Sequence, residues 1–299
     1  MSRQDSAPDE LFDLKAFFFT GNYQACIDEG QKVRVVGDKT TERDLFVFRS
    51  YIAQSKFRVV LDAIKPSADA SLKAIKMYSE FMAANPERKG TIITQLEEML
   101  QKDASNDTLV LVTASALFTA GNHEAALRCL HQSNDLECLN LSVKILLSIN
   151  RVDLAAKEQK KMCEMDEDSI LTQLATAWLN VARGGPKVQD AYHIFQDLQE
   201  RFQSTPFLLN SVAVCHLSQG RLEEAMECVK EAYDKDNSNV ETLVNYVTVL
   251  SLSGKNEMAK RYVSQLHESH PQHPIVLDWV TKESEFDMLS SQILANRAM

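Results

Sequence analysis

The stretch PFLLNSVAVCHLSQGRLEEAMECVKEAYDKDNSN, residues 206–239, decides the fold, because residues 240–273 repeat its plan. Each copy reads as two short amphipathic helices joined at a glycine, Gly220 in the first copy and Gly254 in the second. The second helix of the first copy carries an apolar stripe at spacings of three and four, made of Leu222, Ala225, Val229 and Ala232. That spacing places the apolar side chains on one face of a helix.

The turn glycine and the small residue five positions after it have separate physical roles. The glycine lies where the first helix ends and the chain reverses, which favours a positive φ. The small residue, Ala225 or Ala259, lies where the two helices cross, and a small side chain lets the helix axes approach closely. A helical hairpin repeated every 34 residues is the signature of the tetratricopeptide repeat (TPR).

The same register extends back to the N-terminus. The residues predicted to occupy the small-residue position are Cys26, Val60, Thr94, Ala126, Ala155, Ala191, Ala225 and Ala259. Ser55 and Asn150 replace the turn glycine in two copies, and the segment 35–44 is predicted to be a loop. We therefore predict an all-α protein, a right-handed α-solenoid of about eight TPR-like helical hairpins over residues 10–273.

The two ends of the chain differ from the repeats. Residues 1–9 are mostly polar and are predicted to form a flexible lead-in. Residues 274–299 are predicted to form a capping helix, because a solenoid needs an unpaired helix to cover its open end. The apolar positions that fit one such helix are Val276, Trp279, Val280, Phe286, Leu289 and Ile293.

Charge and composition narrow the class of protein. The 299 residues include 32 basic and 42 acidic side chains, a net charge of −10, which disfavours nucleic acid and anionic membrane surfaces as partners. The N-terminal segment has no apolar core of a secretory signal, and no apolar stretch is long enough to span a bilayer. The six cysteines have no CxxC spacing and are interpreted as reduced thiols. A cytosolic protein is expected, without a basic patch or an insertion helix for direct contact with a membrane.

No pattern predicts catalytic, cofactor-binding or metal-binding residues. The sequence has no GxSxG, HExxH or glycine-rich dinucleotide motif. The three histidines of HESHPQH, residues 267–273, lie beside two prolines between repeats and are interpreted as a solvated turn rather than a metal site. We therefore expect a protein that acts by binding and is not an enzyme.

A binding groove can be predicted from the register, because the first helix of each hairpin lines the concave side of a TPR stack. The residues predicted to face this groove are Phe18, Arg49, Ile52, Phe118, Lys144, Trp178, Asn210, Val214 and Asn245. The set is mixed but largely apolar. It suits a folded or extended hydrophobic protein segment better than a short acidic tail.

Several longer stretches are more specific than the repeat signature. They include DELFDLKAFFFTGNYQACI (9–27), EAALRCLHQSNDLEC (124–138) and DEDSILTQLATAW (166–178). In these stretches the sequence resembles the epsilon subunit family of coatomer, the COPI vesicle coat, and the resemblance runs nearly end to end. It implies a TPR solenoid that closes around its partner, and it carries no catalytic residues.

The resemblance also implies a role. The implied partner is the C-terminal domain of the coatomer alpha subunit, which this chain would stabilise within a seven-subunit coat. That coat moves proteins from Golgi to endoplasmic reticulum and within the Golgi, so the implied location is the cytoplasm, peripheral on Golgi membranes and COPI-coated vesicles.

An alternative function is a TPR adaptor of the co-chaperone type that clamps a C-terminal peptide. Such a clamp needs Lys, Asn and Arg side chains on successive inner helices. The candidates are Lys15, Arg49, Asn140, Lys144, Asn210 and Asn245. They are spread over the whole solenoid rather than over three consecutive hairpins.

Overall fold

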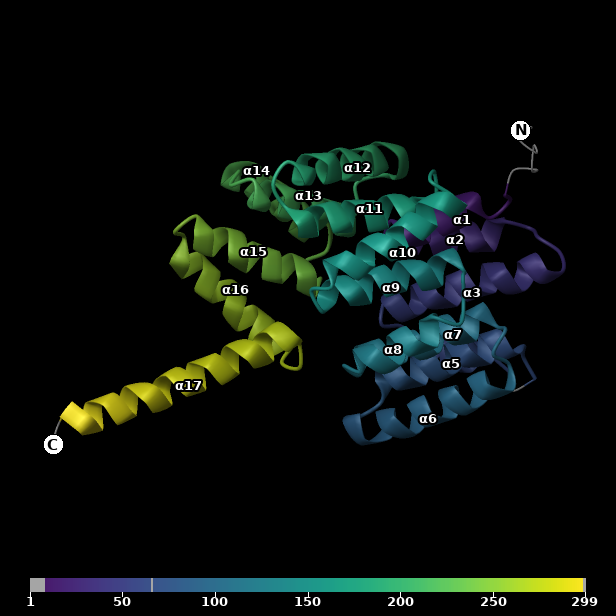
Figure 1. Cartoon of the computed structure of the whole chain (residues 1–299), viewed down its shortest axis with the longest axis horizontal. Coiled ribbons are helices and arrows are strands. Elements are labelled where there is room, and N and C mark those ends of the chain that lie inside the picture. The colour runs from purple at the N-terminus through teal and green to yellow at the C-terminus, as the bar shows by residue number, and fades with distance from the viewer. Residues whose placement is uncertain (1–8, 66, 298–299) are drawn as a thin grey trace. The chain divides into compact units, whose positions relative to one another are not determined.

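The computed structural model describes residues 9–65 and 67–297, which form helices and no strands (Figure 1). Eight helical hairpins follow one another: α1 (Phe12–Phe19) with α2 (Tyr23–Lys32), α3 (Asp38–Ala53) with α4 (Phe57–Ala63), α5 (Ala70–Ala83) with α6 (Pro86–Lys102), α7 (Asp107–Thr119) with α8 (His123–Leu130), α9 (Leu136–Ser148) with α10 (Val152–Met165), α11 (Ile170–Arg183) with α12 (Lys187–Phe202), α13 (Pro206–Ser218) with α14 (Leu222–Lys235), and α15 (Val240–Leu252) with α16 (Asn256–Ser269). A final helix, α17 (Pro274–Arg297), follows them. The predicted all-α fold of TPR-like hairpins is confirmed. The predicted lead-in lies outside the described residues except for Asp9.

The chain divides into two compact units. The N-terminal unit runs to Leu208, and the C-terminal unit runs from Leu209, so the division falls within α13. Each unit has its own buried clusters of apolar side chains. None of the helices in the described part of the chain has both the length and the apolar content that crossing a bilayer requires.

Six hairpins share one turn geometry. At the end of α7, the amide of Gly121 donates to the carbonyl of Phe118 (2.9 Å) and the amide of Asn122 donates to that of Leu117 (2.9 Å). This pair of bonds satisfies carbonyls that the helix end leaves without a partner. The central residue has a positive φ in every case, and these residues are Gly21, Ser55, Gly121, Asn150, Gly220 and Gly254. Ser55 and Asn150 therefore take the place of the turn glycine, as predicted.

The small-residue position is confirmed in seven hairpins and wrong in one. The side chains of Cys26, Val60, Ala126, Ala155, Ala191, Ala225 and Ala259 are buried. Thr94 is exposed, and α6 instead buries Ile92, Leu96 and Leu100. The α6 helix starts at Pro86 without a left-handed turn before it. Its buried stripe therefore begins two residues earlier than predicted, and two residues rotate a helix face by about 200°.

The loop predicted at 35–44 is shorter than expected. The α3 helix begins at Asp38, after Gly37 has reversed the chain with a φ of +71°. An ion pair between Lys15 of α1 and Glu42 (2.7 Å) stabilises the polar first turns of α3. A charged run can therefore be helical when the neighbouring hairpin supplies the opposite charge.

The α17 helix is a single helix of 24 residues within the segment predicted to cap the solenoid, but only its start is packed. Val276 is buried and Trp279 is half-buried, and both contact the cluster that contains Leu243 of α15 and Leu266 of α16. Beyond Trp279 the large apolar side chains are exposed. Within the C-terminal unit, α17 thus covers α15 and α16 with its first turns alone.

Candidate functional site

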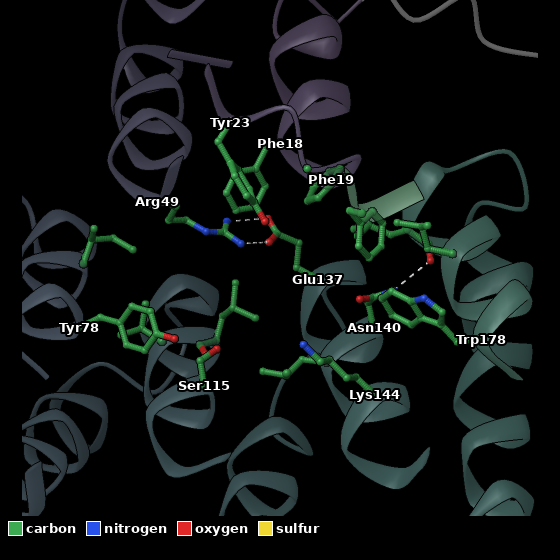
Figure 2. A pocket seen from close by; sticks show the side chains of 18 residues that line it. Phe18, Phe19, Tyr23, Arg49, Tyr78, Ser115, Glu137, Asn140, Lys144 and Trp178 are labelled. Atoms are coloured by element: carbon green, nitrogen blue, oxygen red, sulfur yellow. Dashed lines mark hydrogen bonds and ion pairs between the residues drawn. The ribbon is translucent and has the colours of Figure 1, made fainter. Parts of the chain in front are cut away.

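The N-terminal unit contains a cavity of about 290 Å³ that is lined by the first helices of its six hairpins. These helices are α1, α3, α5, α7, α9 and α11, and Tyr23 of α2 and Phe207 add to the lining. Figure 2 shows the arrangement, with Phe18 and Phe19 on one side, Tyr78 and Ser115 on another, and Trp178 opposite Tyr78. The first helices therefore form the inner surface of this unit, as expected for TPR hairpins.

Aromatic rings from the first hairpin form one wall of the cavity. The ring centroid of Phe18 lies 5.3 Å from that of Phe46 and 5.9 Å from that of Tyr23, both edge to face. Phe19 lies edge to face with Phe46 at 5.7 Å and also packs on the α9 and α11 cluster. The run of three phenylalanines in α1 is apolar on more than one face because this helix has neighbours on several sides.

The first hairpin also contacts the segment that follows α12. The hydroxyl of Thr205 donates to the backbone carbonyl of Thr20 (2.6 Å), and both residues are buried. The amide of Asn22 donates to the side-chain oxygen of Gln203 (3.2 Å). Figure 1 shows α1 beside α11, in agreement with their contact. We call the contact of residues 12–22 with residues 202–207 the closure contact, since it joins the first hairpin to the end of the sixth and the start of the seventh.

An ion pair joins α3 to α9 at the cavity. Arg49 donates from Nη1 to Oε1 of Glu137 (3.1 Å) and from Nη2 to Oε2, and each side chain is 20% exposed. The guanidinium also lies over two rings, 4.5 Å from the centroid of Phe18 and 5.1 Å from that of Phe46. Burial by itself lowers the pKa of Arg49, but the charge and hydrogen bonds of Glu137 outweigh it, so the pKa is raised. The guanidinium of Arg49 therefore stays charged near neutral pH.

Polar side chains of α9 continue along the cavity from Glu137. Asn140 donates to the backbone carbonyl of Leu171 (3.0 Å) and so joins α9 to α11. Lys144 is exposed, and its Nζ lies 5.9 Å from the ring centroid of Phe118. In Figure 2 both side chains lie between Ser115 and Trp178. The lining therefore combines half-buried aromatic rings with a few oriented polar groups, which is typical of binding sites.

The predicted groove residues fall in three places. Phe18, Arg49, Lys144 and Trp178 line the cavity together. Ile52 does not line it, because its side chain is buried in the core cluster with Val60 and Ile75. Phe118 packs against the same cluster and lies beside the ring of His123 (5.4 Å).

The remaining predicted residues belong to the C-terminal unit. Asn210 donates to the hydroxyl of Thr242 (2.7 Å) and accepts from the amide of Asn245 (3.0 Å), so it joins α13 to α15. Val214 is half-buried in α13. Asn210 is buried, and its observed contacts link the first helices of successive hairpins.

Most of the other cavity residues were not predicted, among them Glu137, Tyr78 and Phe207. Glu137 could have been found, because Glu137, Asn140 and Lys144 recur at spacings of three and four on one face of α9. Its pairing with Arg49 could not, because 88 residues separate the two and no local pattern links them.

The carboxylate-clamp alternative gains no support from these contacts. Lys15 is paired with Asp9 (2.9 Å) and Glu42 (2.7 Å), and Arg49 is paired with Glu137. A peptide carboxylate would have to displace carboxylates of the same chain. Across residues 9–65 and 67–297, no cluster of three His, Cys, Asp or Glu side chains has the arrangement of a metal site.

Comparisons with known proteins agree on one family. The family model described as the coatomer epsilon subunit matches residues 7–294. The chain is 36% identical to coatomer subunit epsilon-2 of Arabidopsis thaliana, over 96% of this chain and 98% of that protein. It is 32% identical to coatomer subunit epsilon of Caenorhabditis elegans, over 95% and 98% of the two chains.

Among solved structures, a tetratricopeptide repeat protein from Parabacteroides merdae is similar, with a TM-score of 0.59 and 15% identity. The match covers 86% of this chain and 97% of that one and supports the TPR fold. The family model and the sequence relatives both extend over nearly the whole chain, and on that evidence this chain belongs to the coatomer epsilon subunit family, a structural and non-enzymatic component of the COPI coat in vesicle transport.

Proposed function

We propose that this chain binds the C-terminal domain of the coatomer alpha subunit and stabilises it within the coat. In this proposal the chain is peripheral on Golgi membranes and COPI-coated vesicles, facing the cytoplasm, and other coat subunits make the membrane contact. It would support transport from Golgi to endoplasmic reticulum and within the Golgi. Membership of the family supports the setting, and the cavity of the N-terminal unit supports the binding site.

The observation that carries the binding site is the set of half-buried aromatic side chains that face the cavity. Phe18, Tyr23 and Trp178 are neither in a closed core nor free in solvent. Arg, Trp and Tyr side chains held in a pocket of this kind carry most of the binding energy in many interfaces. Polar groups of Asn140 and Lys144 next to them can fix the orientation of a bound segment.

The size of the cavity restricts the mode of binding. A volume of about 290 Å³ is at the lower limit of pockets for small ligands, so it accepts one or two side chains rather than a folded segment. We infer that a large apolar side chain of the alpha subunit enters the cavity. The rest of the partner would then contact the rim.

Replacement of Trp178 by alanine tests this site. We expect the affinity for the recombinant alpha C-terminal domain, measured by calorimetry, to fall by more than ~30-fold, equivalent to ~2 kcal/mol. The matched control is Phe118→Ala, because Phe118 is also half-buried but does not line the cavity. A Trp178→Ala variant with unchanged affinity and a lower Tm would show that Trp178 serves the core and would overturn the proposed site.

A further inference from the structure

The second half of α17 carries an apolar stripe that has no neighbour in the described part of the C-terminal unit. Its large apolar side chains Phe286, Leu289, Ile293 and Leu294 are 70%, 54%, 55% and 63% exposed. We call these four residues the α17 stripe. The helix has 24 residues, whereas α13 and α15 have 13 each, so about half of α17 extends beyond its packed start. Exposed contiguous apolar surface of this kind marks an interaction site.

The α17 stripe continues the face of the helix that packs against α15 and α16 at its start. Val276 and Trp279 pack against Leu243 and Leu266 in the C-terminal unit. Phe286 follows Trp279 by seven residues and Ile293 follows Phe286 by seven, and at about 100° per residue these positions share one side of a helix. The face that buries Val276 against α15 and α16 is thus left uncovered further along.

The charges beside the stripe define the chemistry of its partner. Glu283 and Asp287 lie along one edge of the stripe and Glu285 lies along the other, and all three are exposed. Lys282 lies seven residues before Leu289, on the same side of the helix, and pairs with Asp278 one turn earlier. Both edges are therefore acidic, and a complementary surface carries Lys or Arg at its rim.

We propose that the α17 stripe binds an apolar helix of another coat subunit, and that this helix carries Lys or Arg beside its apolar face. Side chains at spacings of three and four fit between those of a second helix packed along the first. This interface is separate from the cavity. The proposal rests on membership of the coat family and does not depend on the proposed alpha-subunit site.

Two other occupants fit the stripe less well. A second copy of this chain would place the same acidic edges against one another, and like charges across an interface oppose association. A membrane surface attracts helices whose polar face is rich in Lys and Arg, whereas the flanks of this stripe carry Glu283, Glu285 and Asp287.

Site-specific photo-crosslinking in the reassembled coat tests the proposal. A photoreactive residue is placed at position 289 and, as the matched control, at position 288. Leu289 and Met288 are 54% and 57% exposed, but Met288 lies on nearly the opposite side of the helix from Phe286. We expect position 289, and not position 288, to crosslink to an apolar helix with basic neighbours in a different coat subunit.

Leu289→Asp and Met288→Asp give a second, independent readout. We expect Leu289→Asp, but not Met288→Asp, to lower the affinity for the crosslinked subunit at least ~10-fold. Circular dichroism checks that both variants are equally helical. Binding to the alpha C-terminal domain through the cavity is measured separately with Trp178→Ala. Crosslinks from position 289 to a second copy, to lipid or to this same chain, or equal crosslinking at both positions, would each overturn the proposal.

Discussion

The two units are built from the same hairpin but use it differently. In the N-terminal unit, contacts between distant hairpins join Arg49 to Glu137 and Thr20 to Thr205, and a cavity remains inside. In the C-terminal unit, the polar and aromatic contacts, such as that of Asn210 with Thr242, join neighbouring hairpins, and α17 extends past its support. A few contacts between distant residues therefore decide whether a stack of similar repeats closes.

The largest expected effect comes from a glycine at the closure contact. Gly21 has a φ of +80°, and a Cβ there would lie 2.9 Å from Cβ of Phe207. Gly21→Ala therefore combines left-handed strain with overpacking, and we expect a loss of about 2–5 kcal/mol of unfolding free energy. Gly254→Ala in the C-terminal unit is the control, because its φ is +72° and a Cβ there meets nothing.

Hydrogen exchange measured separately over the two units distinguishes these glycine variants. Gly254→Ala should lose only the strain of about 1–2 kcal/mol, and only in the C-terminal unit. Equal losses for the two variants would show that the closure contact adds no stability.

The second effect concerns the ion pair at the cavity. Arg49→Met leaves the half-buried carboxylate of Glu137 without its partner, and we expect a loss of about 2–3 kcal/mol, less than for a fully buried pair. Adding Glu137→Met should recover most of the loss, since no uncompensated charge remains. The exposed Lys282–Asp278 pair of the C-terminal unit is the comparison, and Lys282→Met should cost less than about 0.5 kcal/mol. Urea unfolding of the three variants measures the differences.

The third effect tests what the two units share. Ala126 of the N-terminal unit and Ala225 of the C-terminal unit are both fully buried at a helix crossing. Replacing either by leucine should cost about 1–3 kcal/mol, because the helices would have to separate. Thr94→Leu, at the exposed position that the repeat spacing wrongly selected, should stay within about 0.5 kcal/mol in thermal unfolding. A large cost at Thr94 would restore the original register of α6.

The smallest effect concerns pH and the tyrosine cluster of the C-terminal unit. Burial, together with the neighbouring Tyr262, raises the pKa of Tyr246 from 10.0 to about 12. Between pH 10 and 12 the folded unit therefore holds more protons than the unfolded chain, so stability is complete below pH 10 and falls as pH rises. Tyr246→Phe should reduce this slope in urea titrations between pH 8 and 11. An unchanged slope would assign it to other groups, such as Tyr23 and Tyr78, whose pKa values burial also raises.

Local patterns predicted the hairpins better than the contacts among them. Turn residues at Ser55 and Asn150 were found because their spacing marks the left-handed position, which depends on the backbone alone. Thr94 was misplaced because α6 starts in a different turn, and the helical start of α3 was missed because its charges are balanced by Lys15 of another hairpin. Errors thus arose where a neighbouring element, rather than the local sequence, decides the structure.

The same distinction between local pattern and tertiary contact applies to the residues of the cavity. A helical face can be predicted from spacing, and Phe18, Lys144 and Trp178, which were assigned to inner faces, line the cavity. Their part in partner binding stays a prediction. Ile52 was assigned to the same groove but is buried in the core, although it follows Arg49 of the cavity by only three residues of α3. The repeat spacing of this chain determined the TPR fold, and its long family-specific stretches determined the coatomer family. The sequence alone also showed the acidic net charge and no catalytic motif.

Only the tertiary structure decided that residues 12–22 meet residues 202–207, that Arg49 meets Glu137 across a small cavity, and that the α17 stripe is exposed. The physical reason is distance along the chain. Helix periodicity and turn chemistry act over a few residues and are written in the sequence, whereas closure depends on small rotations between successive hairpins that add up over many repeats.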